Sequence, residues 1–117
     1  MTRSPAAARA PLLEDDMQAG VIALARMLGY RVAHFRPALT AKGWRTPVSG
    51  DGKGFPDLIL VRRGRVIVAE LKSAKGECTP EQEAWLDSFR ASCAEVYVWR
   101  PADYPNVIKA LLQGASA

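Results

Sequence analysis

The chain has 117 residues, enough for one domain with its own hydrophobic core and too few for two. Hydrophobic residues make up 49% and charged residues 24%, as in soluble globular proteins, and no apolar run approaches the ~18 residues of a membrane helix. We therefore expect a cytoplasmic protein without a membrane partner, whose net charge of +4 permits but does not require binding to a polyanion.

Residues 1–13 contain prolines and arginines but no continuous apolar core, so they do not form a secretory signal and are expected to be a flexible tail. Residues 14–117 are then a single domain. Cys78 and Cys93 could pair, but two free thiols are expected in a reducing compartment. His34 is the single histidine of the sequence, so no Cys/His cluster for zinc exists and a metal ion would need oxygen ligands.

Apolar residues recur with helical spacing from Glu14 to Leu28, and Gly29 is placed to end that helix. Glu14 and Gln18 lie on or beside the apolar stripe that would pack onto a sheet. Glu14 therefore has two interpretations. It is either an acid that complements the helix dipole or a side chain that reaches a site on the sheet.

The segment Tyr30–Arg36 is predicted to be a strand that ends before Pro37. A lone histidine on a strand, such as His34, is more often a hydrogen-bonded structural residue than a ligand contact. The connection 38–55 that follows is long and rich in glycine. Long loops are usually functional, so we expect a mobile arm that grips a nucleic-acid backbone, with plain disorder as the alternative.

Two apolar runs on either side of Arg62-Arg63-Gly64-Arg65 predict a β-hairpin. If Arg63-Gly64 is the tip, the residue numbers of every cross-strand pair have the same sum, and Asp57 lies opposite Glu70 on a shared face. Like charges directly opposed destabilise a sheet, and a buried unpaired charge costs more. A bound cation would remove both penalties.

Lys72 lies two residues beyond Glu70 and therefore faces the same way as that carboxylate. The alternative is that Asp57 caps a turn and that Glu70 and Lys72 belong to an ordinary surface ladder. The four apolar residues before Glu70 favour a strand buried on both faces instead. An all-oxygen ligand set at this position suits Mg²⁺ or Mn²⁺.

Thr79-Pro80-Glu81-Gln82 is a capping box with proline at the first helical position, which predicts a helix to about Ala91. Gln82 has two interpretations. It either only returns a hydrogen bond to the helix cap, or it also brings its side-chain amide toward the charged residues on the sheet. A strand over Glu95–Arg100 and a helix over Asp103–Leu112 complete the chain. Strands alternating with helices indicate an α/β domain with a helix-flanked sheet.

These motifs, in this order, resemble the virus-type replication-repair (VRR-NUC) branch of the restriction-endonuclease-like superfamily over about residues 14–112. The resemblance implies an αβββαβ core with a central mixed sheet flanked by helices. The motifs that carry it are Glu14-x-x-x-Gln18, His34-Phe35-Arg36, Gly54-Phe55-Pro56-Asp57, Glu70-Leu71-Lys72 and Thr79-Pro80-Glu81-Gln82.

The resemblance further implies a divalent-metal-dependent endonuclease with Mg²⁺ or Mn²⁺ and no organic cofactor. Its metal ligands would be Asp57, Glu70, the backbone carbonyl of Leu71 and, directly or through water, Glu14. Lys72 would orient or deprotonate water and contact the scissile phosphate, and Gln82 would position Lys72 or the phosphate, leaving 5′-phosphate products.

Branched DNA, such as a Holliday junction cut by a homodimer, is the expected substrate. Cleavage of flaps, duplex or RNA remains an alternative, as does an inactive nucleic-acid-binding or docking module. The residues expected to contact nucleic acid are Lys42, Arg45, Lys53, Arg62, Arg63, Arg65, Lys75, His34, Arg36 and Gln18.

Overall fold

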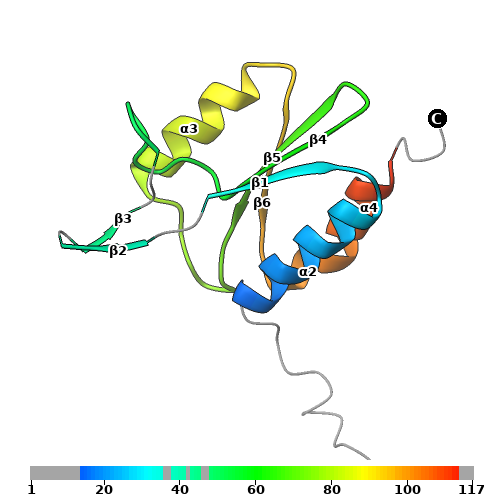
Figure 1. Cartoon of the computed structure of the whole chain (residues 1–117), viewed down its shortest axis with the longest axis horizontal. Coiled ribbons are helices and arrows are strands. Elements are labelled where there is room, and N and C mark those ends of the chain that lie inside the picture. Colours follow the sequence, from blue (N-terminus) through cyan, green and yellow to red (C-terminus); the bar gives the residue numbers. More distant parts are fainter. Residues whose placement is uncertain (1–13, 36–37, 42, 46–47, 114–117) are drawn as a thin grey trace, which may run out of the picture.

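The computed structural model describes residues 14–35, 38–41, 43–45 and 48–113. The tail predicted for residues 1–13 therefore lies outside the described part of the chain. Figure 1 shows a sheet with helices packed against it and a small hairpin that projects from the body. In chain order the elements are α2 (Glu14–Met27), β1 (Arg31–His34), β2 (Ala38–Thr40), β3 (Gly43–Arg45), β4 (Leu58–Arg62), β5 (Arg65–Leu71), α3 (Pro80–Arg90), β6 (Glu95–Trp99), the short 3-10 helix η1 (Pro101–Asp103) and α4 (Tyr104–Leu112).

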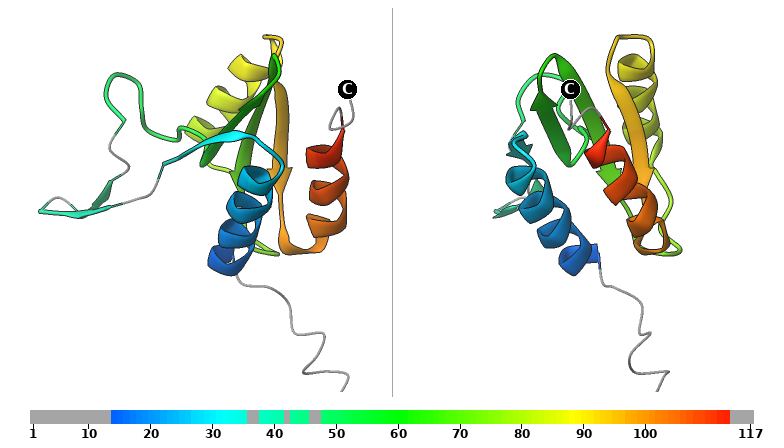
Figure 2. Two further views of the ribbon diagram at one scale, coloured as in Figure 1. Left: turned by 45° about the vertical axis from the view of Figure 1, so that its right-hand side comes forward. Right: turned by 90° about the vertical axis from the view of Figure 1, so that its right-hand side faces the viewer.

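The main sheet of the described chain contains four strands in the order β1-β4-β5-β6. β1, β4 and β5 are antiparallel neighbours, whereas β6 runs parallel to β5. Parallel neighbours need a crossover connection, and α3 supplies it between β5 and β6. Helices α2 and α4 lie on one face of the sheet and α3 lies on the other (Figure 2). The predicted α/β class, a central mixed sheet flanked by helices, is confirmed.

The β4–β5 hairpin has the predicted register. Arg62 pairs with Arg65, and the ladder keeps that register through its five paired positions. The next step along both strands sets Asp57 opposite Glu70. Every residue of the stretch Ile67–Leu71 is buried. The prediction that this strand is covered on both faces is therefore confirmed.

The main hydrophobic core lies between the sheet and the α2/α4 pair. Leu60 of β4 and Ile67 of β5 are fully buried there together with Met17 of α2 and Leu111 of α4. Because side chains alternate along a strand, the carboxylates at one end of β4 and β5 point to the opposite face, which α3 shares. The helix-covered sheet thus fixes the backbone on which those carboxylates are held.

The connection 38–55 contains more regular structure than the sequence predicts. We expected a loop without strands, but β2 and β3 pair as an antiparallel hairpin with Leu39 opposite Trp44. Leucine, threonine and tryptophan suit a strand. Each run is only three residues long, however, and glycine and proline around it hide the pattern.

Several element ends differ from the sequence-based expectation by a few residues. The first strand ends at His34, the Phe35 N–H donates to the Asp57 carbonyl oxygen at 2.9 Å, and the predicted end at Arg36 lies outside the described residues. The last helix begins after a 3-10 turn, at Tyr104. Within the described residues, no helix has the length and apolar character needed to cross a membrane.

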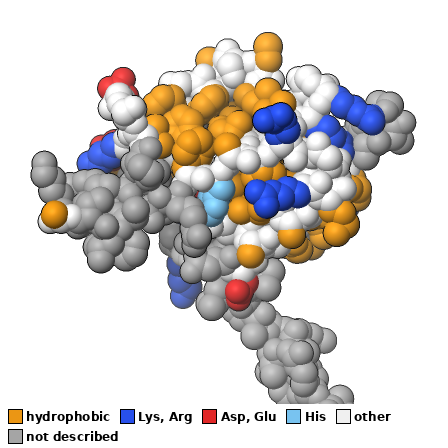
Figure 3. All heavy atoms as spheres, viewed as in Figure 1, with side chains coloured by type: hydrophobic (Ala, Val, Ile, Leu, Met, Phe, Trp, Pro, Cys, Tyr) orange, Lys and Arg blue, Asp and Glu red, His pale blue; other side chains and the backbone are white. Residues whose placement is uncertain are grey.

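Part of the sheet face that α3 shares is open beside the edge strand β1. A groove of about 310 Å³ lies there, lined by Arg31, Ala33, Ile59 and Val61 together with Val32. Val61 is 36% exposed. Figure 3 shows hydrophobic side chains gathered on the face viewed in Figure 1, with Lys and Arg side chains beside them.

Candidate active site

Four predicted site residues converge from three elements. Asp57 directly precedes β4, Glu70 lies near the end of β5, Lys72 directly follows β5, and Gln82 is in the first turn of α3. The loop before Asp57 also packs tightly on α3. Gly54 has a φ of +81°, and a Cβ there would lie 2.6 Å from the Glu81 carbonyl carbon, so only glycine permits this approach.

Gln82 connects the cap of α3 to the charged groups on the sheet. Its Oε1 accepts hydrogen bonds from the Thr79 N–H at 2.8 Å and from Lys72 Nζ at 2.7 Å. Its Nε2 donates to Glu70 Oε2 at 3.2 Å. Of the two alternatives that the sequence left open for Gln82, the structure shows the second, since the same amide completes the capping box and also contacts the Glu70–Lys72 pair.

Asp57 is held beside the backbone of β5. Its Oδ2 accepts a hydrogen bond from the Leu71 N–H at 2.8 Å. Burial raises the pKa of Asp57, whereas the hydrogen bond from Leu71, the contact with the Glu70 carboxyl group and the charges of Lys72 and His34 act in the opposite direction. His34 is half-buried at the end of β1 and pairs in register with Leu58, the residue after Asp57.

Glu70 is a buried acid in which one carboxylate oxygen has partners and the other has none among the described residues. The residue is 2% exposed. Its Oε2 contacts Gln82 and lies 3.5 Å from Lys72 Nζ, whereas its buried Oε1 has no hydrogen-bond partner among the described residues. Burial, and next the charge of Asp57, raise the pKa of Glu70 to about 8. Loss of hydration and a like charge both disfavour the ionised form.

The donor set fits a hard divalent cation. A cation between Asp57 and Glu70 would give Oε1 of Glu70 a partner and would offset the repulsion that raises its pKa. The described side chains contain no group of three or more His, Cys, Asp or Glu residues that could hold a metal. Further ligands would therefore be backbone oxygen, water or Glu14, whose side chain lies outside the described part of the structure.

Arg62 and Arg65, predicted to contact nucleic acid, lie on the α2/α4 face of the hairpin. The Arg62 guanidinium donates to the carbonyl oxygens of Leu28 and Gln113, each at 2.8 Å. Arg65 donates to the Tyr30 hydroxyl at 2.7 Å and forms a salt bridge with Glu95. Their side chains thus have intramolecular partners, and their contact with nucleic acid stays a prediction.

The other predicted nucleic-acid contacts are distributed widely. Arg63 is exposed at the hairpin tip, about 20 Å along the strand from Asp57 at 3.3 Å per residue. Lys53 and Lys75 are exposed in the loops that precede Asp57 and follow Lys72. Gln18 is half-buried on α2. Residues Arg36 and Lys42 and the side chain of Arg45 lie outside the described structure.

Arg100, which no motif in the sequence indicates, holds the loop that follows Lys72. Its Nη1 donates to the carbonyl oxygens of Ser73 at 2.8 Å and Gly76 at 2.5 Å, in the loop that leads from Lys72 to α3. The parallel pairing of Leu71 with Trp99 brings Arg100 beside this loop. The sequence contained one indication of this contact. A helix between two strands predicts that the strands are parallel neighbours, and this pairing places the residue after β6 beside the residue after β5.

Comparison with known proteins identifies the class. Residues 17–103 match the sequence model of the VRR-NUC domain. One similar solved structure, a "VRR_NUC domain", has 24% identity and a TM-score of 0.59 over 82% of this chain and 94% of its own. Another, a "VRR_NUC domain protein", has 23% identity and a TM-score of 0.60 over 89% of this chain and 88% of its own. The comparison with curated proteins gives no match.

The match of the family model defines a nuclease-type domain, and at these identities the two solved structures support its fold. The chain belongs to the VRR-NUC domain family.

Proposed function

We propose that this VRR-NUC domain is a divalent-metal-dependent endonuclease that hydrolyses DNA phosphodiester bonds to leave 5′-phosphate ends. The observation that carries the proposal is the buried Oε1 of Glu70, which lacks a partner among the described residues although the carboxyl group faces Asp57. An apolar side chain would be more stable at such a position. A cation-binding role explains why an acid is there.

Asp57, Glu70 and the Leu71 carbonyl would hold Mg²⁺ or Mn²⁺, with Glu14 as a further ligand directly or through water. When bound, the ion would activate a water molecule and offset the charge of the phosphate. Gln82 and Lys72 both contact Oε2 of Glu70, which leaves Oε1 of Glu70 open. A separate hydrogen bond, donated by Lys72 Nζ to Gln82 Oε1, orients Lys72, whose remaining N–H donors can reach a phosphate oxygen or the attacking water.

The proposed substrate is branched DNA, such as a Holliday junction, and the proposed active particle is a homodimer. Symmetric incision of a four-way junction requires two sites related by a twofold axis. The excess of basic over acidic residues, 16 against 12, supports binding to a phosphate backbone without base recognition.

A panel of labelled duplex, flap, splayed and four-way DNA substrates, incubated with Mg²⁺, Mn²⁺ or EDTA, tests the proposed function. We expect metal-dependent cutting with a preference for the four-way junction, 5′-phosphate ends, and a particle mass in solution of twice the chain mass. Asp57→Asn should abolish cutting while the thermal unfolding transition remains. Cutting that persists in EDTA, or in Asp57→Asn, would contradict the proposed role of the carboxylates.

A further inference from the structure

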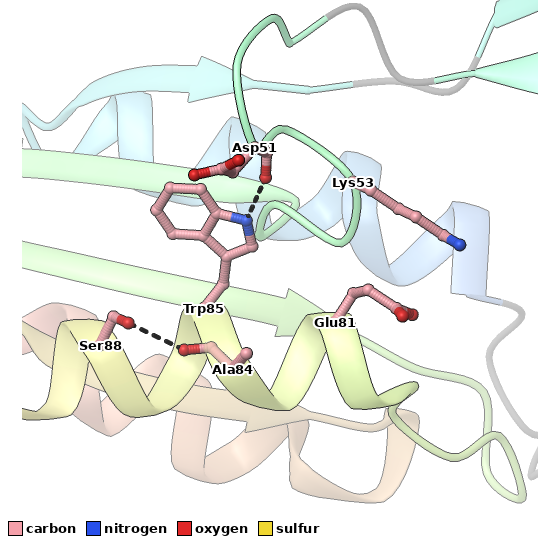
Figure 4. A pocket seen from close by; sticks show the side chains of 6 residues that line it. All are labelled: Asp51, Lys53, Glu81, Ala84, Trp85 and Ser88. Atoms are coloured by element: carbon pink, nitrogen blue, oxygen red, sulfur yellow. Dashed lines mark hydrogen bonds between the residues drawn. The ribbon is translucent and has the colours of Figure 1, made fainter.

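A groove on α3, separate from the one beside β1, lies near the candidate active site and has no role in the chemistry described above. It is a groove of about 330 Å³ between α3 and the loop that precedes Asp57. Figure 4 shows its lining side chains, with the Trp85 indole reaching from α3 toward that loop. The lining residues are Asp51, Lys53, Glu81, Ala84, Trp85 and Ser88.

Trp85 is held in a fixed orientation. Its Nε1–H donates to the Asp51 carbonyl oxygen at 2.9 Å. The ring centroid of Phe55 lies 4.9 Å from that of Trp85 at an interplanar angle of 77°, and Phe89 lies at 5.9 Å. The polar group of the indole is therefore already used, and what Trp85 offers the groove is a rigid aromatic surface. Rigid aromatic surfaces are the usual stacking platforms for nucleobases.

Each wall of the groove contains a residue that lies close in the chain to an active-site residue. Glu81 on the helix wall directly precedes Gln82, and Lys53 on the loop wall lies four residues before Asp57. Gly54 packs against the backbone of Glu81 and Gln82, which joins the walls. A nucleotide next to a phosphate bound at Asp57 and Glu70 would thus lie near the mouth of this groove.

We propose that the groove binds one unpaired nucleobase of the strand held at the active site, stacked on Trp85. This inference rests on the proposed nuclease function. A volume of about 330 Å³ is at the lower end of small-ligand pockets, and a paired base would not offer its face to the indole. Lys53, exposed at the rim, supplies a positive charge for the adjoining backbone phosphate.

The two acidic side chains of the groove define which base it takes. Asp51 and Glu81 would repel a phosphate inside the groove but can accept hydrogen bonds from exocyclic amino groups. Adenine, cytosine and guanine carry such a group with two N–H donors, whereas thymine offers only its single ring N3–H. The groove therefore binds an unpaired amino-bearing base in preference to thymine.

The test uses DNA in which a single unpaired 2-aminopurine is placed next to the branch point, because stacking quenches the fluorescence of this amino-bearing base. Binding is measured in EDTA, so that the DNA stays uncut. We expect quenching with the native chain. Ala84→Leu fills the groove from an exposed position on α3, and should remove the quenching and weaken binding of this DNA about 5- to 100-fold.

Two variants make the test specific. Ser88→Leu fills the same groove from the next turn of α3 and should act like Ala84→Leu. Ala23→Leu makes the same change at an exposed alanine of α2 and should leave quenching and affinity unchanged. Thermal unfolding of all three variants shows whether each one is folded.

Equal quenching by the native chain and both groove-filling variants would overturn the inference, as would the absence of quenching with the native chain. Equal affinity for DNA with an unpaired thymine would overturn the base preference. Cutting without quenching would remove the base site and leave the nuclease proposal intact. Quenching without metal-dependent cutting would contradict the nuclease proposal and leave the base-binding groove supported.

Discussion

Glu70 occupies a position at which folding alone favours an apolar side chain. The residues around it in β5 are aliphatic and buried, and its own Oε1 finds no partner among the described residues. A buried polar group without a hydrogen-bond partner destabilises the native state and so lowers the free energy of unfolding. Active sites commonly reduce stability in this way, because groups arranged for substrate or metal are poorly satisfied without them.

Replacement of Glu70 by glutamine should stabilise the metal-free protein. The pKa of Glu70 is raised from its ordinary value of 4.5 to about 8. Between these pH values the native state binds more protons than the unfolded state, so this group lowers the free energy of unfolding as pH rises from about 5 to about 8. Glutamine does not titrate. In EDTA, Glu70→Gln should therefore be more stable than the native chain by about 1–3 kcal/mol at pH 8 and by less at pH 5.

Urea denaturation at the two pH values measures this difference. Glu83→Gln, the same change at an exposed position on α3, is the control and should show no such pH dependence. A stability difference between Glu70→Gln and the native chain that is the same at pH 5 and pH 8 would show that Glu70 titrates normally.

Gln82 should affect turnover more than substrate binding. In Gln82→Glu the donor to Glu70 is lost and a third carboxylate faces a site that already holds two. Replacing groups that orient metal ligands usually costs about 10- to 100-fold in activity. We expect kcat to fall by that factor with KM nearly unchanged, and Glu83→Gln again serves as control. A change confined to KM would place Gln82 in substrate binding instead.

At the scale of elements, the tip of the β4–β5 hairpin holds the ends of two helices. Arg62 donates to the Leu28 carbonyl after α2 and to the carbonyls of Leu111 and Gln113 at the end of α4. Its guanidinium also lies 4.4 Å from the centroid of the Tyr30 ring. Cations are favourable at helix C-termini, where carbonyl oxygens lack helical partners.

Arg62→Ala should therefore destabilise the fold by about 2–3 kcal/mol, because several charge-assisted hydrogen bonds are lost. Arg62 is also predicted to contact nucleic acid, and that role would appear separately, as a flatter salt dependence of DNA binding in Arg62→Ala. Arg63→Ala, at the exposed neighbouring position, is the matched comparison and should have the smaller effect on stability. Urea denaturation and binding titrations at several salt concentrations measure both properties. An unchanged salt slope in Arg62→Ala would remove this residue from the predicted nucleic-acid interface. Unchanged stability would contradict its role at the helix ends.

Arg100 should control the order of the loop between the proposed catalytic lysine and α3. Its two hydrogen bonds to the carbonyls of Ser73 and Gly76 hold that loop against the end of β6. In Arg100→Ala we expect faster tryptic cleavage after Lys75, which is exposed in the same loop, together with lower kcat. Arg90→Ala, which removes an exposed arginine on α3, is the control. An unchanged cleavage rate at Lys75 would show that other contacts fix the loop.

At the scale of the whole molecule, the sequence predicts the parts of the fold that local rules determine. The turn at Arg63-Gly64 fixes the hairpin register, and strand alternation then places Asp57, Glu70 and Lys72 on one face. The capping box fixes the start of α3. These features depend on residues close together in the chain, so that they could be derived without knowledge of the tertiary structure.

Features that depend on distant contacts could not be derived in this way. Arg62 and Arg65 look like surface charge in the sequence, and only the packing of α2 and α4 brings carbonyl oxygens to them. Arg100 reaches its loop because β6 pairs in parallel with β5. The groove at Trp85 forms only where the loop before Asp57 meets α3, and this contact joins segments about 30 residues apart in the chain, so the helix pattern alone does not predict it.

The central claim is that Asp57 and Glu70 together hold one divalent cation. A crystal of the native chain soaked in Mn²⁺ and measured at the manganese absorption edge tests it most directly. We expect an anomalous peak within coordination distance of an Asp57 carboxylate oxygen and of Oε1 of Glu70. A map without a peak between these two carboxylates, in a crystal where both side chains are ordered, would contradict it.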